Sequence, residues 1–350
     1  MSPYHRVVQA QELGIAASPA FSAAEAARYR DEGWWIDSTI SDAVRRNAAR
    51  TPEATAYLDH PDSSLTWREL DRAATALAGE LAGLGVGVGD RIAVWHGDTS
   101  AIHALYVAIE RCGAVVVGIG ARAGTREVTQ LLHTAQPRLI VSDRQRGDAA
   151  STAVTGMDGV GVLVLDALSL NTGVPPKPVP ADAAVGPDDV FLINSTSGTT
   201  GMPKCVVHTQ NRWHYFHQQA VANGLLSGDD VVMPVISTPF GFGVWTTHTT
   251  PIHLGATAVL LERFTPAATC EAIARHRVTV LCCVSTQLTM LMADRASRDH
   301  DLSSLRVVFT GGEALPYRPA AEFEELTGAK ILQFYGSNET GLLSGTTLDD

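Results

Sequence analysis

Apolar positions in the first half of this chain form helical stripes that alternate with short uninterrupted runs. Thr66 and Glu69 fit a capping box, in which each side chain satisfies a backbone N–H of the other residue. A stripe with helical spacing follows and is closed by Gly85, a residue that commonly ends helices. Its members are Leu70, Ala74, Leu77, Leu81 and Leu84.

Segments of strand length and of helix length then alternate along the rest of the chain, which predicts parallel sheets covered by helices. We therefore expect an α/β fold with two doubly wound, mostly parallel sheets. The expected strands are 91–95, 115–117, 138–141, 162–165, 190–193, 231–235, 257–261, 279–284, 306–309 and 330–334. The expected helices lie near 100–111, 211–222, 266–275, 286–293 and 319–327.

A proline-rich segment, Val174–Pro180, interrupts this alternation. It predicts a first α/β subdomain over residues 1–173, a linker over 174–188 and a second subdomain over 189–350 that carries the site. Ligands of doubly wound sheets bind beyond the carboxyl ends of the strands, so we expect the binding residues in the loops that follow strands.

The composition of the chain disfavours some classes of binding partner and indicates a compartment. The 350 residues carry a net charge of −11, which disfavours broad binding to nucleic acid or to an anionic membrane. The longest apolar runs are too short to cross a bilayer, and the N-terminus lacks a secretory signal pattern. Five cysteines without paired spacing favour a reducing cytoplasm. A homodimer is left open.

The segment Ser195–Lys204 concentrates two glycines, five hydroxyl side chains, a proline and a lysine between two strand-like runs. Hydroxyls, closely approaching backbone N–H groups and one cation suit a polyphosphate. It is not a Walker A loop, because its lysine follows Met-Pro and is not followed by Ser or Thr at the start of a helix. We interpret it as a flap between two strands. A solvated turn is the simpler alternative, but it does not account for the run of hydroxyls followed by Pro-Lys.

Two further glycine-bearing loops follow strands in the second half. Thr310–Pro316 contains Gly-Gly-Glu, and Tyr335–Gly341 contains an aromatic ring and a carboxylate. Each is weak evidence alone. Together with the first loop they offer a phosphate clamp, a slot for a flat ring, an aromatic face and a carboxylate suited to Mg²⁺.

These loops, in this order, resemble those of the adenylate-forming superfamily, which contains acyl- and aryl-CoA synthetases, peptide-synthetase adenylation domains and luciferases. The resemblance covers nearly the whole chain and includes Leu65–Leu70 and Gly89–Val94. It implies ATP- and Mg²⁺-dependent activation of a carboxylic acid to an acyl-adenylate, followed by transfer to a thiol, usually that of CoA. In this sequence it implies that the phosphates of ATP are bound by Thr196, Ser197, Gly198, Thr199, Thr200 and the catalytic Lys204. It implies that the adenine and the acid are contacted by Gly311, Gly312, Glu313, Ala314, Phe334, Tyr335 and Gly336. It also implies that Glu339 binds Mg²⁺.

Two departures from the family pattern affect the predicted activity. Asn338 stands where the family usually has a threonine that contacts the α-phosphate, so we expect altered geometry there. The chain stops at Asp350, before the ribose-binding Asp, the hinge and the C-terminal domain with its adenylation Lys. We therefore expect a fragment of a longer protein. An acyl-adenylate-binding protein that does not adenylate, and an acyl-AMP ligase that loads a carrier-protein thiol, remain as alternatives.

The loop Thr238–Trp245 occupies the place where the family lines its acid pocket. It lacks the Asp that pairs with an amino group in amino-acid-activating members, which favours an apolar acyl or aryl acid. The pocket residues predicted on this basis are His214, Phe240, Gly241, Phe242 and Gly243. Aromatic residues here could equally pack the core. Neither a metal site at His214 and His217 nor a dinucleotide loop at Gly85–Gly89 is favoured.

Overall fold

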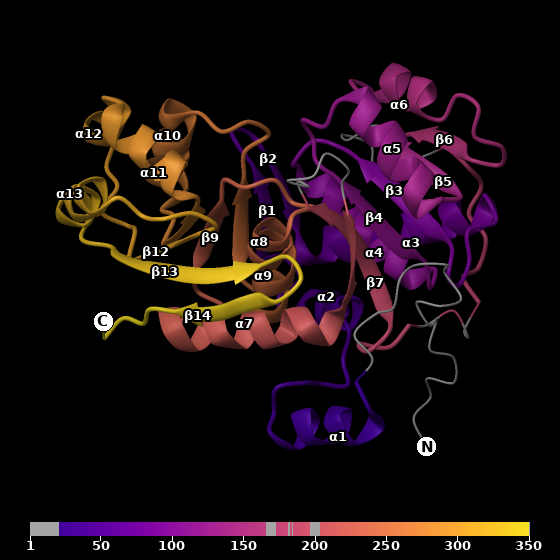
Figure 1. Ribbon diagram of the computed structural model, residues 1–350, viewed down its shortest axis with the longest axis horizontal. Coiled ribbons are helices and arrows are strands. Elements are labelled where there is room, and N and C mark those ends of the chain that lie inside the picture. Colours follow the sequence, from indigo (N-terminus) through magenta and orange to yellow (C-terminus); the bar gives the residue numbers. More distant parts are fainter. Residues whose placement is uncertain (1–20, 166–172, 181–182, 184, 197–203, 350) are drawn as a thin grey trace. The chain divides into compact units, whose positions relative to one another are not determined.

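The computed structural model describes residues 21–165, 173–180, 183, 185–196 and 204–349 (Figure 1). The chain divides into two compact units. Unit 1 comprises residues up to Thr51 together with Arg68–Tyr215, and unit 2 comprises Pro52–Trp67 together with Phe216–Asp350. Each unit is built on one mostly parallel sheet with packed helices, so the predicted fold class is confirmed.

Unit 1 contains a six-stranded sheet in the order β6-β5-β3-β4-β7-β8, in which only the β7–β8 pair is antiparallel. Strand β4 is a continuous buried run, as expected of a parallel strand covered on both faces. The strands are β3 (Arg91–Trp95), β4 (Val115–Ile119), β5 (Leu139–Ser142), β6 (Gly161–Val164), β7 (Val190–Thr196) and β8 (Lys204–Thr209). The helices are α1 (Ala23–Asp31), α2 (Ile40–Arg50), α3 (Trp67–Gly83), α4 (Ser100–Arg111), α5 (Thr125–Ala135) and α6 (Gly147–Ala153).

Unit 2 contains an eight-stranded sheet in the order β14-β13-β12-β11-β9-β10-β1-β2, with antiparallel pairs only at its two edges. Helix α7 (Gln210–Gly224) carries the boundary between the units. The strands are β1 (Thr55–Asp59), β2 (Ser63–Thr66), β9 (Val231–Pro234), β10 (Thr257–Leu260), β11 (Val280–Cys283), β12 (Val307–Gly311), β13 (Lys330–Ser337) and β14 (Gly341–Gly345). The helices are α8 (Gly241–Val244), the π-helix η2 (Trp245–Thr249), α9 (Thr250–Leu254), α10 (Pro266–His276), α11 (Ser285–Ala293), α12 (Ala296–Asp299) and α13 (Tyr317–Thr327).

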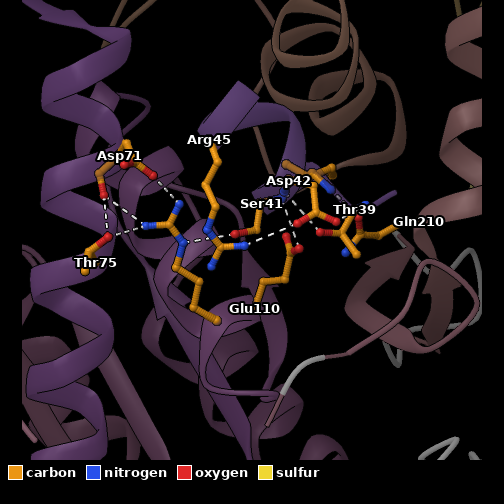
Figure 2. Close-up of polar contacts among 10 residues, drawn as sticks. Thr39, Ser41, Asp42, Arg45, Asp71, Thr75, Glu110 and Gln210 are labelled. Carbon is orange, nitrogen blue, oxygen red and sulfur yellow. Dashed lines mark hydrogen bonds and ion pairs between the residues drawn. The ribbon is translucent and has the colours of Figure 1, made fainter. Parts of the chain in front are cut away.

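A partly buried polar cluster joins α2, α3 and α4 in unit 1 (Figure 2). Arg111 donates from Nε to Ser41 Oγ (2.9 Å), from Nη1 to Thr75 Oγ1 (2.6 Å) and from Nη2 to Asp71 Oδ1 (2.6 Å). Beside it, the buried Glu110 accepts from the Ser41 N–H (3.0 Å). Burial raises the pKa of Glu110, although these hydrogen bonds and the nearby Arg111 oppose the rise.

The proline-rich segment packs within unit 1. The Lys177 N–H donates to Gly79 O of α3 (2.8 Å), and a Cβ added at Gly83 would lie 2.6 Å from Pro175 O. One boundary between the two compact units falls within α7, between Tyr215 and Phe216. Strand pairing explains part of this division, because β1 joins the unit 2 sheet by pairing with β10 about 200 residues further along the chain.

The structure also adds helical turns where the sequence analysis reads a loop, since α8 and η2 cover residues 241–249. Glycine has low helix propensity, so the Gly-Phe-Gly sequence does not predict the helix that forms here. In the part of the chain that the structure describes, no helix combines the length and the apolar character needed to span a membrane.

Candidate functional site

The β7–β8 pair brings the two ends of the hydroxyl-rich loop together. Thr196, the last residue of β7, pairs with Lys204, the first residue of β8, and Ser195 pairs with Cys205. The two strands on either side of this segment are thus paired antiparallel. Lys204 therefore starts a strand at the base of this loop. The predicted phosphate-binding residues Ser197, Gly198, Thr199 and Thr200 lie outside the described residues.

Gly311, the last residue of β12, and Gly312, the residue after it, are glycines for different physical reasons. A Cβ added at Gly311 would lie 2.6–2.8 Å from three ring carbons of Phe334, so only glycine lets that ring lie against the backbone. Gly312 has φ +86°, in the left-handed region that favours glycine. The Gly-Gly pair thus combines a close aromatic contact with a sharp change of chain direction after the strand.

Glu313 lies at the N-terminus of α11. Its Oε1 accepts from Thr286 N (2.6 Å) and from Thr286 Oγ1 (2.7 Å). A carboxylate at this place satisfies a helix N–H that has no partner within the helix, and its charge complements the helix dipole. In this structure Glu313 therefore fixes the turn after β12 against α11.

Phe334 and Tyr335, two consecutive aromatic residues of β13, point to opposite faces of the sheet. Successive side chains of a strand alternate between faces. Tyr335 is 70% exposed, whereas Phe334 is half-buried and contacts other aromatic rings. The exposed ring of Tyr335 is accessible to solvent, and its stacking on a flat ligand stays a prediction.

A tight turn between β13 and β14 carries Asn338 and Glu339. Ser337 and Thr340 bracket this turn, and their hydroxyls lie 2.9 Å apart. Two backbone N–H groups also donate to these hydroxyls, each at 3.2 Å. Glu339 is exposed and Asn338 is half-buried. The sequence analysis treats 335–341 as a loop, but the backbone continues as a strand to Ser337 and returns as β14.

Close packing also fixes the glycines of this hairpin. A Cβ at Gly336 would lie 1.9 Å from Gly341 O, and one at Gly341 would lie 1.5 Å from the Phe216 ring. Gly341 has φ +67° as well. Glycine is required at both positions for the hairpin to hold Glu339 where it is.

The predicted acid-pocket residues fall in both units. Phe240, which is 40% exposed, directly precedes α8, and Gly241, Phe242 and Gly243 form its first turn. His214 lies on the part of α7 that belongs to unit 1. Burial lowers the pKa of His214 to about 4, so the ring is neutral at pH 7. The roles of these residues in binding an acid stay predictions.

The sequence analysis missed Phe309, which lies on β12 and contacts Trp245 with a ring-centroid separation of 5.7 Å. An aromatic residue two positions before Gly311 was the available signal, but only the packing of η2 against β12 shows which ring it contacts. Ala314 lies after β12 and is exposed.

A family model described as AMP-binding enzyme matches residues 44–350. Among curated proteins, the chain is 26% identical to a medium-chain fatty-acid–CoA ligase of Escherichia coli, over 97% of the chain and 62% of that protein. It is 31% identical to an indoleacetate–CoA ligase of Aromatoleum aromaticum, over 86% of the chain and 60% of that protein.

Solved structures show the same fold. A benzoate CoA ligase from Burkholderia xenovorans matches with a TM-score of 0.78 at 25% identity, over 88% of this chain and 63% of that one. The chain spans about three fifths of the length of these two curated relatives.

Proposed function

Because the chain belongs to the AMP-binding enzyme family, we propose that it takes part in ATP-dependent activation of an apolar carboxylic acid and transfer of the acyl group to CoA. The observation that carries this proposal is the turn at Gly311–Gly312, next to the exposed ring of Tyr335. It provides a glycine backbone and an aromatic face at the carboxyl ends of β12 and β13, where doubly wound folds bind ligands.

In the first step, a carboxylate oxygen of the acid attacks the α-phosphorus of ATP, the bond to the bridging oxygen breaks, and pyrophosphate leaves. In the second step, a thiol attacks the acyl carbon and AMP leaves. In this proposal Tyr335 stacks on the adenine, Asn338 donates from its amide to the α-phosphate, and Lys204 with the hydroxyl-rich loop binds the outer phosphates.

The proposed Mg²⁺ depends on Glu339. No group of three or more His, Cys, Asp or Glu side chains able to hold a metal occurs among the residues that the structure describes. One exposed carboxylate on a stiff turn nevertheless fits an ion that arrives with ATP, because Mg²⁺ is commonly bound by one or two carboxylates plus substrate phosphates. When bound, the ion would neutralise charge on the leaving pyrophosphate.

The compartment that we propose is a reducing cytoplasm. All five cysteines are free thiols, and Cys112, Cys270, Cys282 and Cys283 are buried. Burial raises the pKa of Cys283 to about 12, which keeps this thiol protonated and unreactive.

Nucleotide binding can be tested on this chain directly. We expect Tyr335→Ala to weaken AMP binding roughly tenfold in isothermal titration calorimetry, because base stacking on an aromatic ring contributes about 1–3 kcal/mol. Tyr317→Ala is the matched control, since Tyr317 is 86% exposed in the same unit. Equal AMP affinity in both variants would contradict the assignment of Tyr335.

Adenylation is tested by ATP–pyrophosphate exchange on the complete polypeptide, with a panel of apolar acids. Glu339→Gln should abolish Mg²⁺-dependent exchange, whereas Glu325→Gln, an exposed change on α13, should not. Asn338 gives one specific reason to keep a second candidate, an acyl-adenylate-binding protein that does not adenylate. Tight binding of a non-hydrolysable acyl-adenylate mimic without exchange for any acid would favour that candidate. Transfer to a carrier-protein thiol in place of CoA would instead identify an acyl-AMP ligase.

A further inference from the structure

Unit 1 contains a pocket of about 720 Å³ that the proposed function does not use. Residues of α2, α3 and α4 line it together with the proline-rich segment and Val185, and all of them belong to unit 1. Pockets that bind small molecules commonly enclose about 300–1,000 Å³. The pocket is therefore large enough for a small organic ligand.

The pocket and the hydroxyl-rich loop lie at opposite ends of the strands of the same sheet. Helix α4 ends at Arg111, and β4 begins shortly afterwards at Val115, so the end of α4 that lines the pocket is near the amino end of β4. Strand β7 runs parallel to β4, and its carboxyl end at Thr196 leads into the loop. Doubly wound folds bind their substrates at the carboxyl ends of the strands, so this pocket is a different site.

Five charged residues line the pocket in the described part of the chain, and three of them are already in ion pairs. Arg45 pairs with Asp42 at 3.2 Å, and Arg111 pairs with Asp71 at 2.6 Å. Arg111 also donates from Nε to Ser41 Oγ (2.9 Å; Figure 2). These three charges are balanced within the protein.

The other two charged residues of the lining are Glu110 on α4 and Lys177 on the proline-rich segment. Neither has an ion-pair partner among the described residues. Glu110 is only 6% exposed and accepts from the Ser41 N–H (3.0 Å). Burial raises the pKa of Glu110, so a cation beside it would stabilise its ionised form. Lys177 is exposed and brings an ammonium group. The pocket thus offers one carboxylate and one ammonium from different parts of its lining.

The proline-rich segment gives the pocket an apolar and stiff wall. Pro176, Pro178 and Pro180 contribute to the lining, and each proline ring fixes the backbone angle φ. The segment is also held against α3, because the Lys177 N–H donates to Gly79 O (2.8 Å) and a Cβ at Gly79 would lie 2.9 Å from Pro176 Cβ. A wall that is ordered before binding reduces the entropy that a ligand has to offset.

We propose that this pocket binds a small zwitterion with an apolar body, of which an apolar α-amino acid is the simplest example. Its ammonium group pairs with Glu110, its carboxylate pairs with Lys177, and its apolar body lies against the prolines. A ligand with a single charge would use only one of these two groups. This inference goes beyond the proposed function and does not depend on it.

The test measures binding of three probes to this chain by isothermal titration calorimetry. The probes share one apolar side chain: L-leucine carries both charges, L-leucinamide carries only the ammonium group, and N-acetyl-L-leucine carries only the carboxylate. L-leucine should bind about tenfold or more tightly than either of the others, because a hydrogen bond to a charged group is worth about this factor.

Two variants assign the charges. Glu110→Gln keeps an acceptor for the Ser41 N–H and should weaken binding of L-leucine about tenfold, with no change for N-acetyl-L-leucine. Lys177→Met should weaken binding of L-leucine to a similar extent, with no change for L-leucinamide. Lys330→Met is the control, because Lys330 is an exposed lysine of unit 2, and it should leave all three affinities unchanged.

Ala76→Phe tests the location, because Ala76 is an exposed residue of the lining. The larger side chain should weaken binding of all three probes without changing the affinity for AMP. If Glu110→Gln does not fold, Lys177→Met and Ala76→Phe carry the test. Equal affinities of the three probes, no heat of binding for L-leucine at millimolar concentration, or unchanged L-leucine affinity in folded Lys177→Met would overturn this inference. Failure to bind AMP would contradict the proposed function alone.

Discussion

The guanidinium of Arg111 is predicted to be a principal stabilising contact of unit 1. Its side chain is only 5% exposed, and it joins α4 to Ser41 of α2 and to Asp71 and Thr75 of α3 (Figure 2). Burial lowers the pKa of Arg111, although Asp71 partly restores it. The side chain stays charged at neutral pH because an arginine pKa begins far above 7.

Arg111→Ala leaves the Asp71 carboxylate and two hydroxyls without their donor. Removing one partner of a buried ion pair costs about 3–5 kcal/mol. Asp71 keeps a side-chain exposure of 30% and can be rehydrated, so the loss should lie at or just below the lower end of this range. We expect a loss of about 2–3 kcal/mol in the free energy of unfolding. Arg295→Ala is the control, because Arg295 pairs with Asp299 at 87% exposure and such pairs contribute about 0–1 kcal/mol.

The assay is urea denaturation followed by circular dichroism, with the midpoint shift compared at constant slope. A double-mutant cycle with Asp71→Asn isolates the ion pair. Residues in direct contact couple by about 0.5–3 kcal/mol, so Arg111→Ala should cost less when Asp71 is already neutral. A loss no larger than that of Arg295→Ala, or strict additivity with Asp71→Asn, would refute the reasoning.

Three further predictions concern unit 2. Burial raises the pKa of Asp230, but hydrogen bonds led by Arg306 outweigh it and hold the pKa below its usual value. The stability that this lowered pKa contributes is present above about pH 4 and is lost as pH falls through the folded pKa. Asp230→Asn should therefore remove this pH dependence of the free energy of unfolding in urea titrations at pH 2–4. Burial lowers the pKa of His248 to about 3, so stability should fall by up to about 1.4 kcal/mol per pH unit below pH 6.5. His248→Gln should flatten that slope, and an unchanged slope would contradict a buried neutral ring. Gly243→Ala should lower the free energy of unfolding by roughly 3 kcal/mol, because its Cβ would overlap a backbone oxygen. Gly87→Ala is the control, because a Cβ there meets nothing within 4 Å. Thermal unfolding should show a clear loss of stability for Gly243→Ala and little change for Gly87→Ala.

Helices and central strands were predictable because their signals are local. The helix expected near 100–111 is observed as α4 over Ser100–Arg111, and the buried run at 115–117 becomes β4. Periodicity and burial act over a few residues, so the order of residues is sufficient evidence for such elements. The sequence did not predict β1 or the edge strands β2 and β14, because their pairing partners, not their composition, make them strands.

Some features of the candidate site were likewise predictable from local sequence, and others depend on contacts between distant segments. The residue types of the Gly-Gly-Glu turn and of Tyr335–Glu339 are visible in the sequence, and they indicate nucleotide chemistry before any coordinate is known. The sequence does not show that Glu313 binds the N-terminus of α11, nor that Gly311 is required by the Phe334 ring. These contacts join segments more than 20 residues apart, which no local pattern encodes.

The sequence by itself determined the α/β class, the family and the order of the chemical loops, because motif composition and hydrophobic periodicity are properties of neighbouring residues. The tertiary structure alone decided that Phe334 and Tyr335 have opposite surroundings, and that Trp245 begins a π-helical turn behind them. The division at α7 was likewise decided by packing. Close packing is a relation between distant segments, so it fixes which side chains face one another only after the sheet has formed.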